Sequence, residues 1–459
     1  MLPAIIHAIT QAGGRAFEVG GCVRDGILGL PCKDLDIEVF HVSAADLTVI
    51  LSRFGRVNEV GVSFGVSFGV IKLKTTDGTE FDFTLPRREN KSGQGHRGFQ
   101  VEVDHTMTLH EAAARRDFTI NAISRCPQTG ELHDPHGGLV DLERRILRAT
   151  SSHFAEAPLR VLRGMQFAAR FDLVLDQQTA ELARTLRDEY STLSVERVWG
   201  EWHKWATRST LPSRGLQVLA DSSWLDLYPE LAALPGVPQD PQWHPEGDVW
   251  VHTLHVCDAA SRIADRDTLV GDERAILLFA ALCHDLGKAT TTEFFDGHWR
   301  AHGHCEAGVP LSRSFLTRIG CPEAIIEVIE PLVVEHLVHA QRDMSPRTVR
   351  RLAERLGKAT IAQLVRLIEA DMNGRPPLPG GLPPAVQTLV ELAEGMNVDR
   401  SRPKPLILGR HLIALGHRPD VWFGEVLKQC FEAQLDGVFS TEIDGIEFLT
   451  TNVARRSAS

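Results

Sequence analysis

Two acidic residues, Asp34 and Asp36, stand one residue apart in the stretch VGGCVRDGILGLPCKDLDIEVF. The alternating apolar residues Leu35, Ile37 and Val39 predict a short strand, whose two-residue period points both carboxylates to one face. Two carboxylates on one face suit Mg²⁺, a hard cation that prefers oxygen ligands. The alternative interpretation is a strand with a solvated acidic face.

A paired glycine, Gly20-Gly21, precedes the acidic pair. Glycines let backbone amides approach a phosphate closely. Arg24 follows at a predicted helix start, where anions are favoured. Together with the acidic pair, these residues indicate metal-assisted phosphoryl or nucleotidyl transfer. Asp82, on a later predicted strand, is either a third carboxylate of this site or a solvated strand position.

Two later stretches add charged residues at helical spacing. In RRDFTINAI, Asp117 and Asn121 lie four residues apart and hence on one helical face, while Arg115 can hold phosphate oxygens bidentately. Glu156 and Arg160 are also four residues apart. The simpler accounts are an exposed helix start and a surface salt bridge worth only ~0.3–0.5 kcal/mol.

A second group of residues is rich in histidine. Its members are His252, His284, Asp285, His302, His304, His336 and His339. Imidazoles and a carboxylate at this spacing suit a divalent transition metal. The segment LLFAALCHDLGK places His284 and Asp285 near the end of an apolar helix, where unpaired polar groups are costly to bury. The alternative is a set of surface and satisfied core histidines.

The bulk composition is that of an ordinary globular protein. The chain has 459 residues, 43% hydrophobic and 24% charged, which is enough for roughly three domains. No apolar run approaches ~18 residues, so we expect no membrane association. Eight cysteines without a CxxC pair, and an N-terminus without a basic leader, favour the cytoplasm. The net charge of −11 leaves room for RNA binding, because arginines cluster locally.

The pattern along the chain predicts an α+β head followed by helices. Strands are expected at 16–19, 35–40, 66–72 and 80–85, and a basic, glycine-rich loop at 86–98. Helical spacing dominates from residue 151, with proline- and glycine-rich breaks near 234–248 and 375–384. The predicted parts are a head (1–150), a neck that includes the base-recognition region (151–233), a metal phosphohydrolase region (234–345) and a body or tail (346–459).

Six motifs between residues 18 and 202 resemble those of the class II tRNA nucleotidyltransferases, the bacterial CCA-adding enzymes and their poly(A) polymerase relatives. They are VGGCVRDGILG, KDLDIEVF, RRDFTINAI, DPHGGLVDLERRILR, PLRVLRGMQFAARF and SVERVWGEW. The resemblance implies a polymerase-β-like head with a mixed sheet, followed by an all-α neck, body and tail. It also implies template-independent addition of CCA to the 3′ end of tRNA from CTP and ATP, with Mg²⁺.

By this resemblance, Asp34 and Asp36 are the catalytic metal ligands. The implied nucleotide-binding residues are Gly20, Gly21, Arg24, Arg115, Asp117, Asn121, Glu156, Arg160 and Arg163. The family reads the incoming base with a Glu-Asp-x-x-Arg motif, but here Ala157 stands at the Asp position. One good base contact is worth ~1–3 kcal/mol, so its loss predicts a roughly tenfold relaxation of selectivity for C and A over U and G.

The histidine-rich region resembles an HD-type metal-dependent phosphohydrolase. The series WHPE, VHTL, CHDLGK and HGH also occurs in CCA enzymes with a fused HD domain, the multifunctional CCA proteins. The resemblance implies phosphodiesterase and phosphatase activity on 2′,3′-cyclic or 2′-phosphates. The implied metal ligands are His252, His284, Asp285, His304 and His336. The usual pattern closes with an Asp after the last histidines, but here Leu337 follows.

Two alternatives stay open at this point. The nearest is a poly(A) polymerase, or an enzyme that adds only CC or only A. An alternative from another class is an HD phosphohydrolase whose first domain only binds RNA. The intact Asp34 and Asp36 argue against it, and Ala157 argues weakly for it.

Overall fold

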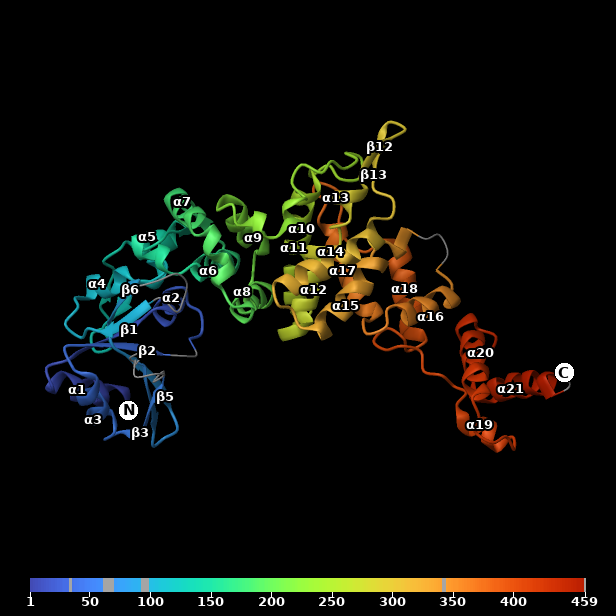
Figure 1. Ribbon diagram of the computed structural model, residues 1–459, viewed down its shortest axis with the longest axis horizontal. Coiled ribbons are helices and arrows are strands. Elements are labelled where there is room, and N and C mark those ends of the chain that lie inside the picture. The colour runs from blue at the N-terminus through green and yellow to red at the C-terminus, as the bar shows by residue number, and fades with distance from the viewer. Residues whose placement is uncertain (33–34, 61–69, 92–98, 341–343, 458–459) are drawn as a thin grey trace. The chain divides into compact units, whose positions relative to one another are not determined.

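The chain forms two compact units, Met1–Tyr228 and Pro229–Ser459. The computed structural model describes residues 1–32, 35–60, 70–91, 99–340 and 344–457. The first unit combines a sheet with helices, and the second is almost entirely helical (Figure 1). The predicted α+β class is therefore confirmed. Within the described residues, no helix has both the length and the apolarity needed to cross a bilayer.

A mixed, seven-stranded sheet forms the centre of the first unit. Its strands are β1 (Arg15–Val19), β2 (Asp36–Phe40), β3 (Gly55–Val60), β4 (Val70–Thr75), β5 (Glu80–Thr84), β8 (Ser124–Arg125) and β9 (Leu132–His133). Their order across the sheet is β3-β4-β5-β2-β1-β8-β9. Strands β2 and β5 run parallel, with Asp36 beside Asp82, and the other neighbouring pairs are antiparallel.

The two faces of this sheet have different characters. Helices α1 (Leu2–Gln11) and α3 (Ala44–Leu51) cover one face, where their apolar side chains pack against Ile37, Val39 and Phe83. Because side chains alternate along a strand, Asp36 and Glu38 point to the opposite face. The apolar core thus fixes the direction in which β2 presents its carboxylates.

The sequence predicted most of the strands. Those expected at 16–19, 35–40 and 80–85 are confirmed to within one residue. The strand expected at 66–72 overlaps β4, which ends three residues later at Thr75, and residues 66–69 lie outside the described part of the chain. The predicted loop at 86–98 is wrong in its first part. Strand β6 (Arg87–Lys91) pairs antiparallel with β7 (Phe99–Val103), whose alternating apolar residues specify a strand partner. Residues 92–98 lie outside the described part of the chain.

Helices complete the first unit, as expected after residue 151. Besides α1 and α3, the helices before residue 151 are α2 (Gly21–Ile27), α4 (Leu109–Ala114), η2 (Thr119–Asn121) and α5 (Gly138–Glu143). Those after it include η3 (Ser152–Glu156), α6 (Leu159–Phe171), α7 (Gln177–Thr185), α8 (Val195–Arg208) and α9 (Pro212–Asp221). Helix α6 packs on α8 and α9 beside a core of fully buried aromatic residues. In that core, Trp202 Nε1 donates a hydrogen bond to Tyr228 Oη at 3.1 Å.

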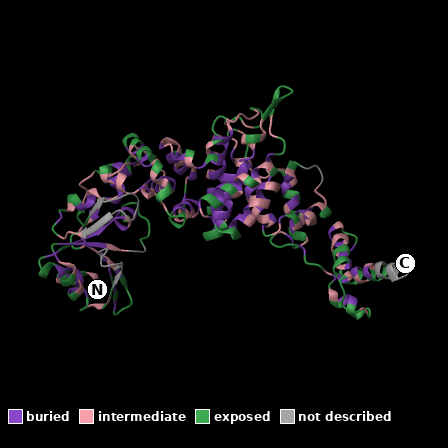
Figure 2. Ribbon diagram, in the orientation of Figure 1, coloured by how far each residue is buried: buried purple, intermediate pink, exposed green. Residues whose placement is uncertain are grey.

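In the second unit, helices surround a buried central helix. Helix α12 (Gly271–Cys283) is buried over most of its length and packs against α11 (Val249–Arg266), α15 (Glu323–Glu335) and α17 (Ile361–Asn373). The other main helices are α10 (Pro229–Ala232), α13 (Lys288–Thr291), α14 (His304–Arg318), α16 (Pro346–Arg355), α18 (Pro384–Gly395), α19 (Gly409–Ala414), α20 (Trp422–Asp436) and α21 (Glu442–Ser457). A hairpin of β12 (Glu293–Phe295) and β13 (His298–Arg300) is largely exposed (Figure 2).

Gly287 marks a close approach of two backbones in this unit. It follows Asp285 by two residues, at the start of α13, and faces the first turn of α14. A Cβ atom added at Gly287 would lie 2.0 Å from His304 O and 2.7 Å from Gly308 N. These are backbone atoms that cannot rotate away. Only glycine therefore allows the segment after α12 to lie against α14.

We expect Gly287→Ala to lower the free energy of unfolding by ~1–3 kcal/mol, because the added methyl group separates the two segments. Gly424→Ala is the matched control. Gly424 lies inside α20 with open space around its Cβ position, so the control should be neutral or stabilising by ~0.5–1 kcal/mol. Scanning calorimetry of both variants measures the effect. Equal melting temperatures for the two variants would contradict this account of the packing.

Candidate functional site

A cavity of about 1120 Å³ opens on the polar face of the sheet in the first unit. Gly20 and Gly21 line it at the start of α2, and Asp36 and Glu38 line it from β2. Its described lining contains nine basic side chains and four acidic ones. The basic ones are Arg24, Arg87, Arg115, Arg116, Arg160, Arg163, Arg170, Lys204 and Arg208. This excess of positive charge favours a polyanionic ligand.

The acidic pair is described in part. Asp34 lies outside the described residues, whereas Asp36 lines the cavity. Asp82, beside Asp36 in the parallel strand pair, forms an ion pair with Lys72 at 2.8 Å. Asp82 is not among the lining residues, whereas Asp36 and Glu38 present carboxylates to the cavity, and this donor chemistry fits Mg²⁺.

Gly20 has a backbone conformation that favours glycine. Its φ angle is 72°, and a Cβ atom there would lie 3.0 Å from the guanidinium of Arg116. Arg116 in turn donates to Glu38 Oε2 at 3.1 Å. A side chain at position 20 would therefore be strained and would crowd this ion pair, which explains the glycine.

Several predicted nucleotide-binding residues form one connected network. Arg24 is buried and donates to Asp25 Oδ1 at 2.7 Å and to the amide oxygen of Asn121. Asn121 Nδ2 donates to Asp117 Oδ1 at 2.9 Å, and Arg163 Nε donates to Asp117 Oδ2 at 2.7 Å. Burial alone would raise the pKa of Asp117, but Arg163 and Asn121 outweigh it and hold this pKa below its usual value. Asp117 is therefore a fixed negative charge that orients Arg163 at the cavity wall.

A second network joins the end of α4 to the start of α6. Arg160 donates to the backbone oxygens of His153, at 2.5 Å, and Arg115, at 2.7 Å. Arg115 pairs with Glu156 at 3.0 Å, and Glu156 also contacts His153 Nδ1 at 2.7 Å. These contacts hold the planar guanidinium of Arg160 in one orientation. Ala157 lines the same cavity with a methyl group only.

Gln166 is a cavity residue that the sequence did not single out. It lies on α6, is 4% exposed and lines the cavity, and its Oε1 has no hydrogen-bond partner among the described residues. A buried, unpaired carbonyl oxygen is costly unless a ligand or water satisfies it. The sequence signal was a polar residue inside the apolar run of α6, between Met165 and Phe167.

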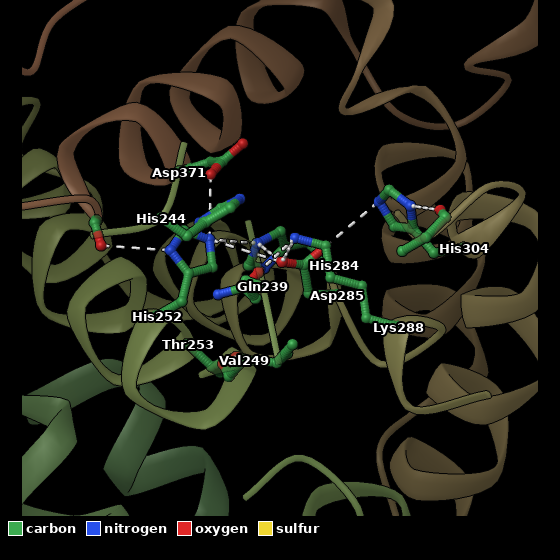
Figure 3. Close-up of polar contacts among 12 residues, drawn as sticks. Gln239, His244, Val249, His252, Thr253, His284, Asp285, Lys288, His304 and Asp371 are labelled. Atoms are coloured by element: carbon green, nitrogen blue, oxygen red, sulfur yellow. Dashed lines mark hydrogen bonds and ion pairs between the residues drawn. The ribbon is translucent and has the colours of Figure 1, made fainter. Parts of the chain in front are cut away.

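Six polar side chains converge in the second unit from the ends of five helices. His252 lies in the first turn of α11, and His284 and Asp285 follow α12 directly. His304 begins α14, His336 follows α15, and Asp371 lies near the end of α17. Figure 3 shows Asp285 between the pair His252 and His284 on one side and His304 on the other. The five ligands predicted from the sequence are thus brought together.

The donor atoms are spaced as ligands around a cation would be. His252 Nε2 lies 3.3 Å from His284 Nε2 and 3.2 Å from Asp371 Oδ1. Asp285 Oδ2 lies 3.2 Å from His284 Nε2 and 3.6 Å from His252 Nε2. Ligands about 2.0–2.2 Å from a tetrahedral metal lie ~3.3–3.6 Å apart. His252, His284 and Asp371 therefore form a group that could hold one cation, and Asp285 Oδ2 lies close to both imidazoles.

Local hydrogen bonds set the orientation of the imidazole rings. The Nδ1 atoms of His284, His304 and His336 each contact the backbone oxygen three residues earlier, at 2.8, 2.7 and 2.7 Å. A carbonyl oxygen can only accept, so each Nδ1 carries the hydrogen and each Nε2 presents a lone pair. His252 Nδ1 contacts Glu246 Oε1 at 2.8 Å. Such outer contacts are typical of histidines that bind metals.

The charges at this centre also favour a cation. Asp285 Oδ2 is buried and has no hydrogen-bond partner among the described residues, although it lies 2.7 Å from Lys288 Nζ. Burial lowers the pKa of His336 to about 3, so its ring is neutral, the form that binds metals. Burial also opposes a charge on His252, yet Asp371 and Glu246 raise its pKa to about 9. The surroundings of His252 thus stabilise positive charge where a cation would bind.

Asp371 and Glu246 were missed in the sequence. The expected closing Asp was sought directly after His336, but α17 supplies it much farther along the chain. A signal was present, because Leu364, Leu367 and Asp371 fall on one face of α17, and a carboxylate in an apolar stripe needs a partner. Glu246 lies in a loop and ends the WHPE motif, to which the sequence analysis assigned no ligand.

A smaller cavity of about 250 Å³ adjoins the histidine-rich centre. His304, His336, Asp285 and Asp371 form one part of its wall. The remainder includes three basic side chains and two aromatic ones, namely Lys288, Arg300, Arg375, Trp243 and Trp299. Cations and aromatic rings beside a metal centre suit a phosphate ester that carries a planar group.

Comparison with known proteins gives matches to both units. Residues 16–148 match the family described as the poly A polymerase head domain, and residues 249–371 match the HD domain. The multifunctional CCA protein of Xanthomonas campestris pv. campestris (strain B100) is 39% identical over 373 residues, which cover 79% of this chain and 85% of that protein.

Two solved structures share the fold. The CCA-adding enzyme of Bacillus stearothermophilus in complex with CTP has a TM-score of 0.64 and 22% identity, over 99% of this chain and 97% of that one. The Thermotoga maritima CCA-adding enzyme complexed with tRNA has a TM-score of 0.61 and 18% identity, over 98% and 94%.

We expect Asp371→Asn to weaken binding of a divalent cation at the histidine-rich centre by at least ~10–100-fold, because the variant removes the charge of an inner ligand. Glu369→Gln is the control, since Glu369 lies on the same helix but pairs with Arg266. Metal content after dialysis, measured by mass spectrometry on an Asp36→Ala background, checks the prediction. Equal metal retention by both variants would remove Asp371 from the ligand set.

Proposed function

This chain belongs to the family of the multifunctional CCA proteins, and on that premise we propose that it adds C, C and A to the 3′ ends of tRNA from CTP and ATP, without a nucleic-acid template. The observation that carries the proposal is the basic cavity above Asp36, lined by Gly20, Gly21 and the base-reading candidate Arg160. The likeness to structures solved with CTP and with tRNA supports these two partners.

The proposed roles follow from the positions of the side chains. Asp34 and Asp36 would hold Mg²⁺, which lowers the pKa of the attacking tRNA hydroxyl and neutralises the triphosphate when bound. Arg115 and Arg163 are held by Glu156 and Asp117 at the cavity wall, where they can orient phosphate oxygens. The attack forms a bond between the tRNA 3′ oxygen and the α-phosphorus, and pyrophosphate leaves.

Base selection is assigned to Arg160. Two backbone oxygens hold its guanidinium, so this side chain can offer its donors in a fixed direction. Because Ala157 has no polar side chain, the motif supplies only Arg160 for base recognition. Gln166 Oε1, a hydrogen-bond acceptor in the same cavity, could take the place of the missing carboxylate. We propose that selectivity for C and A is relaxed relative to an enzyme with the complete motif.

For the second unit we propose hydrolysis of 2′,3′-cyclic and 2′-phosphates at RNA ends. A divalent cation held by His252, His284, Asp285 and Asp371 would supply a metal-bound nucleophile. Lys288, Arg300 and Arg375 line the adjoining cavity and can bind phosphate oxygens.

The cellular setting and the division into domains complete the proposal. No disulfide joins the eight cysteines, all of which lie in the described part of the chain, and this supports a cytoplasmic protein. We retain the four parts predicted from the sequence, with the metal phosphohydrolase region extended from residue 345 to Asp371. That extension follows from the contact of Asp371 with His252.

Two variants should separate the two activities. Asp36→Ala should lower nucleotide incorporation at least ~100-fold, because several kcal/mol of charge stabilisation is lost, and should leave 2′,3′-cyclic phosphate hydrolysis unchanged. His284→Ala should do the reverse, so each variant is the control for the other. The assays use tRNAs ending before C74, C75 or A76 with single labelled nucleotides. If Asp36→Ala left incorporation intact, or if a long A tract grew on unrelated RNA, the CCA assignment would be wrong.

Restoring the acidic side chain should sharpen base selection. We expect Ala157→Asp to increase discrimination against UTP and GTP roughly tenfold, since one bidentate contact is worth ~1–3 kcal/mol. Ala157→Asn, of similar size but without charge, is the control. The measurement is kcat/KM for each of the four triphosphates. A wild-type chain that already rejects UTP and GTP as strongly as Ala157→Asp would show that another acceptor, such as Gln166, selects the base.

A further inference from the structure

Exposed aromatic rings are concentrated beside the smaller cavity of the second unit. Among the Phe, Tyr and Trp residues whose side chains the structure describes, the exposed ones are Trp243, Phe294, Phe295 and Trp299, with exposed fractions of 59%, 62%, 57% and 37%. Trp243 and Trp299 line the cavity, and the other two lie on the hairpin of β12 and β13, which projects from the unit (Figure 1). A group of exposed apolar side chains marks a binding surface, whereas single ones are ordinary. We call these four residues the aromatic platform.

The local sequence specifies the hairpin that carries three of these rings. Asp296 and Gly297 form its two-residue turn, with φ angles of 51° and 79°, as a type I′ turn requires. Phe294 lies opposite Trp299 in the strand register, and their ring centres are 5.0 Å apart. This cross-strand pair stabilises the hairpin. Phe294 nevertheless stays largely exposed, so its ring is available to a ligand.

The hairpin is connected to the cavity through its second strand. His298 Nδ1 contacts Asp240 Oδ2 at 2.7 Å, which joins β13 to the loop that carries Trp243. The guanidinium carbon of Arg300 lies 5.4 Å from the centre of the Phe295 ring, and Arg300 also lines the cavity. A cation beside an aromatic ring suits a ligand in which phosphates alternate with planar bases. The platform therefore extends from the cavity onto the hairpin.

The cavity also contains polar atoms without a partner. Thr292 and Arg375 line it, and Thr292 Oγ1 and Arg375 Nε are buried and have no hydrogen-bond partner among the described residues. Such atoms are costly unless a ligand or water satisfies them. The guanidinium of Arg375 can donate to a phosphate oxygen, and the hydroxyl of Thr292 can donate or accept. These atoms favour a ligand with anionic, polar groups over an apolar protein segment.

We propose that the aromatic platform binds the last nucleotides of a single-stranded RNA whose terminal phosphate reaches the histidine-rich centre. This inference rests on the proposed phosphohydrolase function and deepens it, because the substrate becomes an RNA end rather than a mononucleotide. The terminal base stacks on Trp243 or Trp299 in the cavity, and the preceding base stacks on Phe294 or Phe295. An aromatic ring stacks on any base, so we expect a preference for chain length with little preference for sequence.

Hydrolysis of a short and a longer substrate tests the platform. The full-length protein is assayed with 2′,3′-cyclic AMP and with an RNA trinucleotide of adenosines that ends in a 2′,3′-cyclic phosphate. We expect kcat/KM to be at least ~5-fold higher for the trinucleotide, the lower limit for one stacked base. Changing Phe294→Leu and Phe295→Leu together should remove this preference through a higher KM, because stacking holds the substrate and the transition state equally. The matched control, Phe294→Tyr with Phe295→Tyr, keeps both rings and should keep the preference.

Photocrosslinking gives a second readout, which does not depend on hydrolysis. The trinucleotide then carries 4-thiouridine before its last nucleotide, and mass spectrometry identifies the crosslinked peptide. We expect crosslinks within residues 293–300 of the wild type, because the base before the last one stacks on the hairpin.

The two readouts separate this proposal from the one it rests on. A wild type that hydrolyses both substrates equally well would overturn the platform. A double Leu variant that loses activity on both substrates to the same extent would also overturn it, because the rings would then only stabilise the hairpin. Hydrolysis of the trinucleotide without crosslinks in the hairpin would have the same meaning. Crosslinks in the hairpin without hydrolysis of either substrate would instead overturn the phosphohydrolase function and leave the platform standing.

Discussion

A charge buried in a protein must be compensated, and both sites in this chain are organised by that requirement. In the first unit, Asp117 is buried and receives hydrogen bonds from Arg163 and Asn121. Side chains of the protein itself thus balance the charge of Asp117, and the same contacts hold Arg163 in place at the cavity wall. In the second unit, Asp285 is equally buried, and its Oδ2 atom lies 2.7 Å from Lys288 Nζ and 3.2 Å from His284 Nε2. The same constraint thus yields an oriented arginine in the first unit and a buried cluster of carboxylates, imidazoles and a lysine in the second.

Short-range structure does much of the positioning. In the first unit, strand alternation alone separates Ile37, which enters the core, from Asp36, which faces the cavity. In the second unit, three histidines use the carbonyl oxygen three residues earlier to fix their tautomer. Strand alternation and these hydrogen bonds both involve residues close in sequence, so a few residues are enough to specify the direction of each side chain. The long-range part of the fold then has only to bring these prepared segments together.

The contrast between short-range and long-range structure explains which features could be predicted from the sequence. Alternation revealed β2 and β5, and the spacing of His252, His284 and Asp285 was enough to indicate a metal centre. Asp371 was missed because its partners are remote in sequence and its one sequence signal is a carboxylate within the apolar stripe of α17. Strand β6 was missed because its charged residues resemble a loop, and only pairing with β7 makes it a strand. The link between Arg24 and Asn121 is likewise a product of tertiary structure.

The polar residues of the histidine-rich centre come from five helices, and this affects the order in which the sites form during synthesis. The cluster of His252, His284, Asp285 and Asp371 begins with His252 in α11 and is complete only with Asp371, near the end of α17. A nascent chain emerging from the ribosome folds from its N-terminal end, so the first unit can be compact before α17 has been synthesised. The histidine-rich cluster is therefore assembled at a late stage of biogenesis, after the cavity of the first unit has formed.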